Sequence, residues 1–156
     1  MRMPPKVAVA VAALGLACLC TGLAQAQLIG ISNTRALAFG ELVAGVTSGT
    51  AVVSPAGARI LTGGVSAGNS GGITSASFTV TGIPLLTFAI TLPSSAAITA
   101  GGNSMTVNTF TSSPSSTGQL SVLGSQTVTV GATLNVGASQ ASGSYTGTFS
   151  VTVVYN

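Results

Sequence analysis

The residues that could carry out acid–base or nucleophilic chemistry are few in this sequence. Its 156 residues include no histidine and a single acidic side chain, Glu41, and only 3% of them are charged, against about 25% in ordinary soluble domains. A nucleophilic serine needs a neighbouring base such as histidine or lysine, and the one lysine, Lys6, lies near the N-terminus. One carboxylate cannot form an acid–base pair. We therefore expect no enzyme, no catalytic residue and no bound cofactor.

The N-terminal segment has the features of a secretory signal peptide. A positively charged start precedes an apolar run over residues 7–19, and an A-x-A cleavage site ends at Ala26. We predict that residues 1–26 are a leader that directs export through the inner membrane into the periplasm, and from there to the cell surface or the medium. One alternative is a retained membrane anchor, although the run is shorter than the roughly 20 residues that a span needs. The other is a lipoprotein leader that ends before Cys18.

Removal of this leader changes the chemistry of the chain. Both cysteines, Cys18 and Cys20, would leave with it, so that no disulfide or free thiol remains. The mature charge would be that of Arg35 and Arg59 against Glu41, a formal +1, which provides no basic patch for nucleic acid or an anionic membrane. Zinc needs clusters of cysteine, histidine or carboxylate ligands. We therefore expect no metal site, no nucleic-acid partner and no membrane insertion of the mature chain.

The elements that must position any functional residue are β-strands. Apolar residues alternate with polar ones, mostly Thr and Ser, with a period of two. The alternating runs are residues 78–80, 88–92, 105–107, 128–130, 134–136 and 149–155. Turns rich in Gly, Pro and Ser separate these runs, and the six glycines in residues 57–72 predict a flexible connection. Many short strands with such turns favour an all-β antiparallel sandwich or barrel.

Several motifs resemble those of the DUF4402 family of secreted bacterial proteins, over roughly residues 34–156. They are Phe-Gly at 39–40, Ser-Pro-Ala-Gly at 54–57, Thr-Gly-Ile-Pro at 81–84, the run 130–134 and the C-terminal run 143–156. The C-terminal run is also similar to the ending of chaperone–usher pilins and spore-coat-U-like subunits, with a glycine, alternating apolar residues and a penultimate tyrosine. In this sequence those residues are Gly143, Phe149, Val151, Val153 and Tyr155.

This resemblance implies an immunoglobulin-like antiparallel β-sandwich that lacks one strand and is completed by a donor strand from another polypeptide. Residues 36–156 would form the sandwich. Residues 27–35 would form an N-terminal arm, a candidate donor strand with Ile29 and Ile31 on one face. The implied function is that of a pilin-like structural subunit of a bacterial surface fibre or coat. The implied partners are other copies of this chain or related subunits, with a periplasmic chaperone and an outer-membrane usher.

A different interpretation of the C-terminal run stays open at this stage. Residues 143–156 would then hold the last strand of a sandwich that is already complete, and the protein would be a monomeric secreted binding module or adhesin. Heat-stable multimers of the mature chain would favour the subunit, and a sharp monomer would favour the module.

Overall fold

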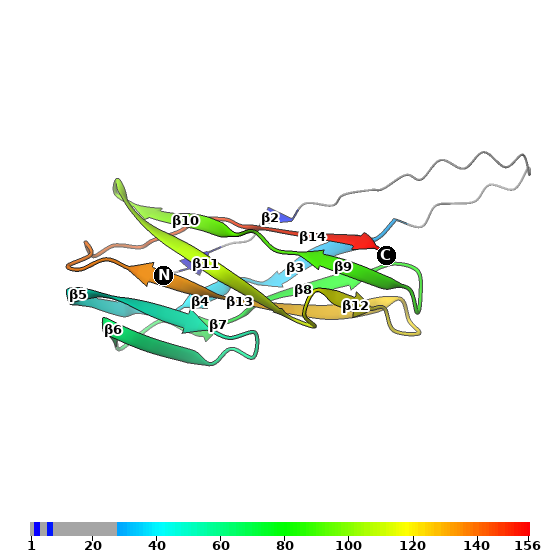
Figure 1. The fold of residues 1–156 in the computed structure, drawn as a ribbon, viewed down its shortest axis with the longest axis horizontal. Helices are drawn as coiled ribbons and strands as arrows, with labels where there is room; N and C mark the ends of the chain where they lie inside the picture. Colours follow the sequence, from blue (N-terminus) through cyan, green and yellow to red (C-terminus); the bar gives the residue numbers. More distant parts are fainter. Residues whose placement is uncertain (1, 4–5, 8–27) are drawn as a thin grey trace, which may run out of the picture.

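The computed structural model describes residues 2–3, 6–7 and 28–156, and all regular structure in them is β-strand (Figure 1). The predicted all-β fold is therefore confirmed. All described strand pairings are antiparallel except that of β2 with β14. The predicted leader lies outside the described residues, apart from the backbone of residues 2–3 and 6–7. No helix in the described part is long and apolar enough to cross a membrane.

The described strands form three hydrogen-bonded sheets. Their bounds are β1 Arg2–Met3, β2 Lys6–Val7, β3 Gly30–Arg35, β4 Leu37–Phe39, β5 Leu42–Val53, β6 Arg59–Ala67, β7 Ile73–Thr74, β8 Ala76–Thr81, β9 Thr87–Thr91, β10 Ser95–Ala100, β11 Asn103–Ser113, β12 Thr117–Gln119, β13 Ser125–Val136 and β14 Ser150–Tyr155. The largest sheet has the order β10-β11-β13-β5-β6, and β8 joins β3 to it through β13. The other two sheets have the orders β12-β9-β14-β2 and β1-β4-β7.

The long strand β13 organises the largest sheet. Residues 125–130 pair with β8, residues 132–136 pair with β5, and β11 lies along the opposite edge. The two alternating runs predicted at 128–130 and 134–136 are thus parts of one strand. β13 therefore pairs with strands that are distant in sequence. It also runs along the length of the molecule (Figure 1).

The glycine-rich stretch predicted as a flexible connection is mostly a strand, so that prediction is wrong. Residues 59–67 form β6 and pair with β5 on both sides of an irregularity in the register. At this irregularity Gly63 has a φ of +65°, and a Cβ there would overlap the carbonyl oxygen of Ser48. Glycine therefore allows the two strands of the β5–β6 hairpin to bend together.

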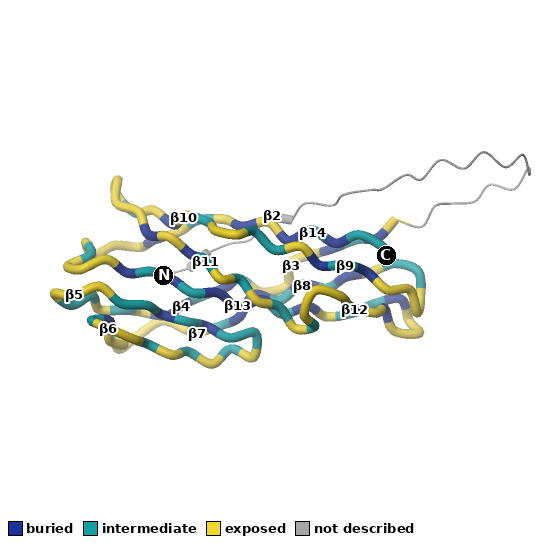
Figure 2. The backbone as a smooth tube through the Cα atoms, in the orientation of Figure 1, coloured by how far each residue is buried: buried dark blue, intermediate teal, exposed yellow. Residues whose placement is uncertain are grey.

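Buried residues alternate with exposed ones along the strands (Figure 2). The core that they form contains most of the aromatic side chains. The prediction that at least five of the seven aromatics belong to the core is confirmed. Buried aromatic residues are Phe39, Phe78, Phe88, Tyr145 and Phe149, and those packed against the core while partly exposed are Phe110 and Tyr155. Aliphatic residues from alternate positions of β13 fill the space between them, as a period of two requires.

Candidate functional site

Two strand edges, those of β4 and β14, are covered within the described part of the chain only by residues 2–3 and 6–7. β14 pairs antiparallel with β9 along residues 152–155, and its other edge is paired, within the described residues, only with β2 through Ser150 and Val151. β4 pairs with β7 on one edge and, again within the described part, only with β1 on the other. We call these outer edges, on residues 37–39 and 150–155, the β4–β14 edges.

The β4–β14 edges lie close to one another. Residues 2–3 pair with β4, and residues 6–7 pair with β14. Only two residues separate β1 from β2, and three Cα–Cα steps of extended chain span at most about 11 Å. A single stretch of backbone therefore reaches both edges, which indicates room for one strand between them.

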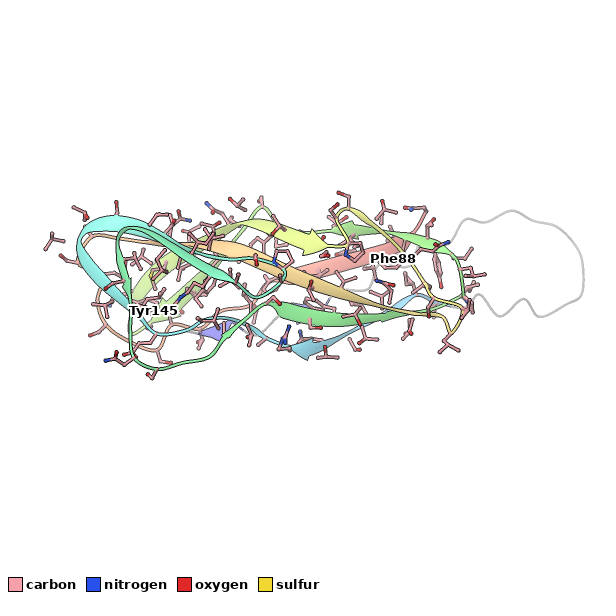
Figure 3. All side chains as sticks on the ribbon, turned by 90° about the horizontal axis from the view of Figure 1, so that it is seen from below. Phe88 and Tyr145 are labelled. Atoms are coloured by element: carbon pink, nitrogen blue, oxygen red, sulfur yellow. The ribbon has the colours of Figure 1, made fainter. Side chains whose placement is uncertain are left out.

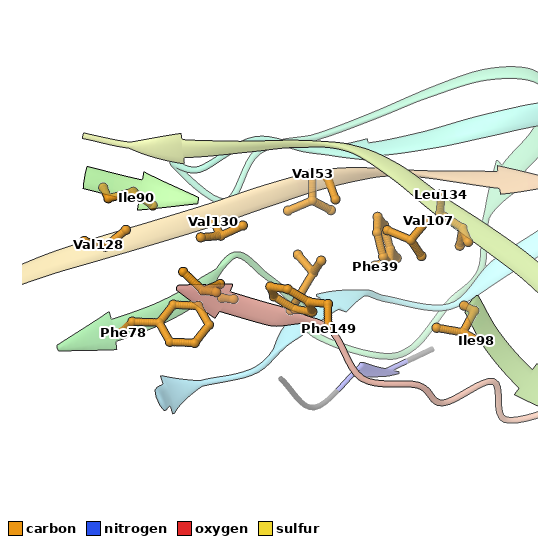
Figure 4. Close-up of a cluster of buried hydrophobic side chains, with 14 of the residues drawn as sticks. Phe39, Val53, Phe78, Ile90, Ile98, Val107, Val128, Val130, Leu134 and Phe149 are labelled. Carbon is orange, nitrogen blue, oxygen red and sulfur yellow. The ribbon is translucent and has the colours of Figure 1, made fainter. Parts of the chain in front are cut away.

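The residues of β14 that the sequence singled out point into the core beneath this edge. Val151 and Val153 are fully buried, and Phe149, just before the strand, is 3% exposed. The Phe149 ring lies edge-on to the Phe78 ring, with centroids 6.2 Å apart (Figure 4). The centroid of the Phe149 ring is also 5.0 Å from that of the Phe110 ring. A strand laid along β14 would therefore extend a sheet that already covers an apolar core.

The predicted N-terminal arm is a strand of its own chain in this structure. Residues 30–35 form β3, which pairs antiparallel with β8, and both Ile29 and Ile31 are buried. The edge of β3 away from β8 pairs with no strand in the described part of the chain. Donation of this arm to another copy would require β3 to leave β8.

Side-chain hydrogen bonds hold β3 in this position. Asn33 donates from Nδ2 to the carbonyl oxygen of Ser77 at 2.9 Å. Arg35 donates from Nε to the carbonyl oxygen of Ser75 at 3.0 Å and from Nη2 to its Oγ at 3.1 Å. Ser75 is the one buried polar side chain among the described residues. No local pattern predicts this contact, because Arg35 and Ser75 are 40 residues apart in the chain.

The two remaining predicted site residues, Gly143 and Tyr155, lie near opposite ends of the C-terminal run 143–156. The Tyr155 hydroxyl accepts a hydrogen bond of 2.7 Å from the backbone N–H of Ile83 and so ties the end of β14 to the turn before β9. Gly143 is exposed in the segment between β13 and β14, where it lines a cavity. The structure therefore brings together the residues of β14 near one edge, while Gly143 lies apart from them.

This cavity, of about 610 Å³, contains the single acidic side chain in its lining. The Ser70 hydroxyl and backbone N–H donate to Glu41 Oε2 at 2.7 and 2.8 Å, and they hold the pKa of Glu41 below its usual value. Arg59 lies nearby but donates from Nη1 to the carbonyl oxygens of Phe39 and Glu41, at 2.8 and 3.2 Å. The carboxylate thus acts as a hydrogen-bond acceptor that fixes the loop around Ser70.

Comparison with known proteins identifies the family. A model of a family described as a domain of unknown function, DUF4402, matches residues 29–155. The chain belongs to the DUF4402 family. No curated protein and no solved structure matches it. The part matched by the DUF4402 model begins just before β3 and ends with β14, so that it includes both β4–β14 edges.

The sequence predicted one of these edges and missed the other. Alternation over residues 149–155 located β14, but Phe39 and Gly40 were noted only as a short motif. The signal for β4 was the apolar, small, apolar pattern of Leu37, Ala38 and Phe39, whose outer two residues are buried. Three residues are too few for a periodic pattern to stand out.

Proposed function

We propose that the mature chain is a structural subunit of a bacterial surface fibre or coat, with an incomplete immunoglobulin-like β-sandwich that accepts a strand between the β4–β14 edges. The observation that carries this proposal is that residues 2–3 and 6–7 alone pair with these edges among the described residues. These residues fall within the predicted leader. Export and cleavage would expose both edges in the mature protein.

The physical argument concerns unpaired backbone. An exposed strand edge presents N–H and C=O groups that another chain can pair with, and strand addition uses these groups for affinity and side-chain positions for specificity. The apolar residues Val151 and Val153 alternate along β14, so an added strand with the same period would complete the covering of the core. Since donor and acceptor surfaces differ, repeated addition builds an open filament rather than a closed ring.

The pairing of β3 with β8 supports a role for this chain as strand acceptor. In the folded subunit the segment containing Ile29 and Ile31 is part of its own sheet. The donor would therefore come from a periplasmic chaperone during export, and from a related subunit or from a copy whose β3 has left β8 during assembly. An outer-membrane usher would be the place of this exchange.

The test of this proposal supplies the added strand from the same polypeptide. A copy of residues 27–33 is attached after Asn156 through a flexible linker long enough to return to the start of β14, a distance of about 20 Å for its six residues. We expect the mature chain of residues 27–156 to form multimers or to require a chaperone, and the extended chain to be a soluble monomer. Size-exclusion chromatography and gels of unheated samples distinguish these states.

The matched control carries the same extension with aspartate at both isoleucine positions of the copy. This extension cannot cover an apolar core without burying unpaired charge, so that it should behave as the mature chain does. A mature chain that folds alone as a sharp, protease-resistant monomer would favour the monomeric binding module or adhesin instead.

A further inference from the structure

An exposed apolar cluster lies on two neighbouring turns, one before β9 and one before β13. Leu85 and Leu86 in the first turn are 57% and 41% exposed, and Val122 and Leu123 in the second are 72% and 87% exposed. We call these four residues the apolar tip. Exposed apolar clusters, unlike single exposed apolar residues, mark contacts with other proteins or with membranes.

Hydrogen bonds join the two turns of the apolar tip to one another. The backbone N–H of Gly82 donates to the carbonyl oxygen of Gly124 at 2.9 Å, and the N–H of Leu120 donates to the carbonyl oxygen of Leu86 at 2.9 Å. In addition, Gln119 donates from Nε2 to the carbonyl oxygen of Leu85 at 3.0 Å. The apolar tip is therefore one fixed surface rather than two independent loops.

The core does not need the side chains of the apolar tip. Two other apolar residues of the same segments enter the core instead, since Leu120 is 1% exposed and Phe88 is fully buried. Leu85 also has a φ of +63°, which is uncommon for a residue other than glycine. Backbone strain that surrounding contacts maintain is typical of functional sites. The exposed side chains therefore indicate a partner outside the folded domain.

The predicted mature chain begins at the same end of the molecule as the apolar tip. Gly30 pairs with Thr81, which directly precedes the first turn of the tip, and Leu28 is 59% exposed. The predicted leader ends at Ala26, and the two Cα–Cα steps from there to Leu28 span at most about 7 Å. A leader held in the inner membrane would therefore keep the apolar tip near the surface of that membrane.

The composition of the two turns specifies the kind of membrane surface that fits them. Residues 82–86 and 120–124 contain no charged side chain, whereas segments that bind anionic headgroups are rich in lysine and arginine. Apolar side chains that protrude from a protein insert at the boundary between headgroups and acyl chains. A deformable lipid surface also needs no pocket of matching shape. Lipids without net charge therefore fit the apolar tip.

We propose that the apolar tip docks this protein onto a membrane surface, with its four side chains inserted among lipids without net charge. The inference goes beyond the proposed function and does not depend on strand addition. The contact would keep the newly exported chain at the outer face of the inner membrane after the leader has been removed.

The first test measures binding of the mature chain, residues 27–156, to phosphatidylcholine vesicles by flotation through a density gradient. We expect the chain to float with the vesicles. Leu123→Asp should lower the partition coefficient at least about tenfold, because insertion would move the aspartate out of water without a partner. Thermal unfolding checks that the variant folds.

Val46→Asp is the matched control, because Val46 is 87% exposed, as Leu123 is. It lies near the other end of β13 from the apolar tip, since the N–H of Ser139, just after β13, donates to the carbonyl oxygen of Gly45 at 2.8 Å. The twelve residues of β13 span roughly 36 Å. The partition coefficient of Val46→Asp should match that of the parent.

A second test places a fluorescent reporter on the apolar tip. The sequence contains no tryptophan, so Leu123→Trp carries a single one. We expect vesicles of brominated phosphatidylcholine to quench its fluorescence, because bromine on the acyl chains quenches an indole ring that reaches them. The fluorescence of Val46→Trp should stay unchanged.

The results that would overturn the membrane contact are distinct from those that bear on strand addition. A parent chain that does not float, equal losses in Leu123→Asp and Val46→Asp, or an unquenched Leu123→Trp would each overturn the contact and leave strand addition intact. Binding that requires anionic phosphatidylglycerol and is lost in high salt would overturn it in favour of an electrostatic contact. Multimers that Leu123→Asp dissolves in the absence of lipid would overturn it in favour of a contact between copies.

Discussion

At the scale of single residues, the one acidic side chain, Glu41, contributes to the response of the fold to acid. Hydrogen bonds from Ser70 lower the pKa of Glu41 from its ordinary value of 4.5. As the pH falls, the unfolded chain therefore binds a proton first, so the contribution of Glu41 to stability is present above pH 4.5 and is lost as the pH falls through the folded-state pKa. The sequence has no histidine, the side chain that ordinarily titrates between about pH 5 and 8.

We predict from this a nearly constant free energy of unfolding between about pH 5 and 9 and a decrease in more acidic solution. Urea unfolding of the mature chain at a series of pH values measures it. In Glu41→Gln, the free energy of unfolding should decrease less in acidic solution, because the variant lacks the Glu41 carboxylate. A steep change near neutral pH would mean that a titrating partner contributes to the fold.

A second residue, Tyr155, connects the end of β14 to the turn before β9. Its hydroxyl accepts a hydrogen bond from the Ile83 N–H, and Tyr155→Phe removes that acceptor. We expect a loss of about 1 kcal/mol in the free energy of unfolding, with faster amide exchange at Ile83 and its neighbours. Unchanged stability and unchanged exchange at Ile83 would show that the hydroxyl does not hold the turn.

At the scale of elements, the bend in the β5–β6 hairpin depends on one backbone conformation. Gly63→Ala would place a Cβ on a residue with a φ of +65° and against Ser48, so we predict a loss of at least about 1 kcal/mol. Gly72→Ala is the matched control, because a Cβ there meets nothing within 4 Å, and it should change stability by less than about 0.5 kcal/mol. Equal effects of the two substitutions would show that the bend does not require glycine.

The sequence predicted elements well where apolar residues alternate without interruption. The runs around Phe78, Phe88 and Val151 were located because each buries one face of a strand. It failed for β6, since the glycines that allow close approach of β5 have no side chains to alternate. The candidate site was half predicted: the pattern of β14 is local, but the coverage of β14 and β4 by residues 2–3 and 6–7 depends on pairings between distant segments, which no local pattern contains.

At the scale of the whole molecule, the structure is an elongated all-β fold whose strands run along its length (Figure 1). Tyr145, in the lining of the cavity beside Glu41, and Phe88, on β9, lie toward opposite ends of the molecule (Figure 3). The proposed strand addition joins a donor surface to a different acceptor surface, so that it would favour a fibre over a closed oligomer.

The central claim is that the outer edge of β14 is unpaired in the mature chain and is completed by an added strand. Residue-resolved amide exchange by NMR, on the mature chain and on the same chain with residues 27–33 copied after Asn156, tests it most directly. In the mature chain kept monomeric at low concentration, we predict that outward-facing amides of residues 150–153 exchange at least about tenfold faster than those of β13, and that the added strand slows them. Equally slow exchange of these amides in both proteins would contradict the account, because β14 would then already be paired on both edges.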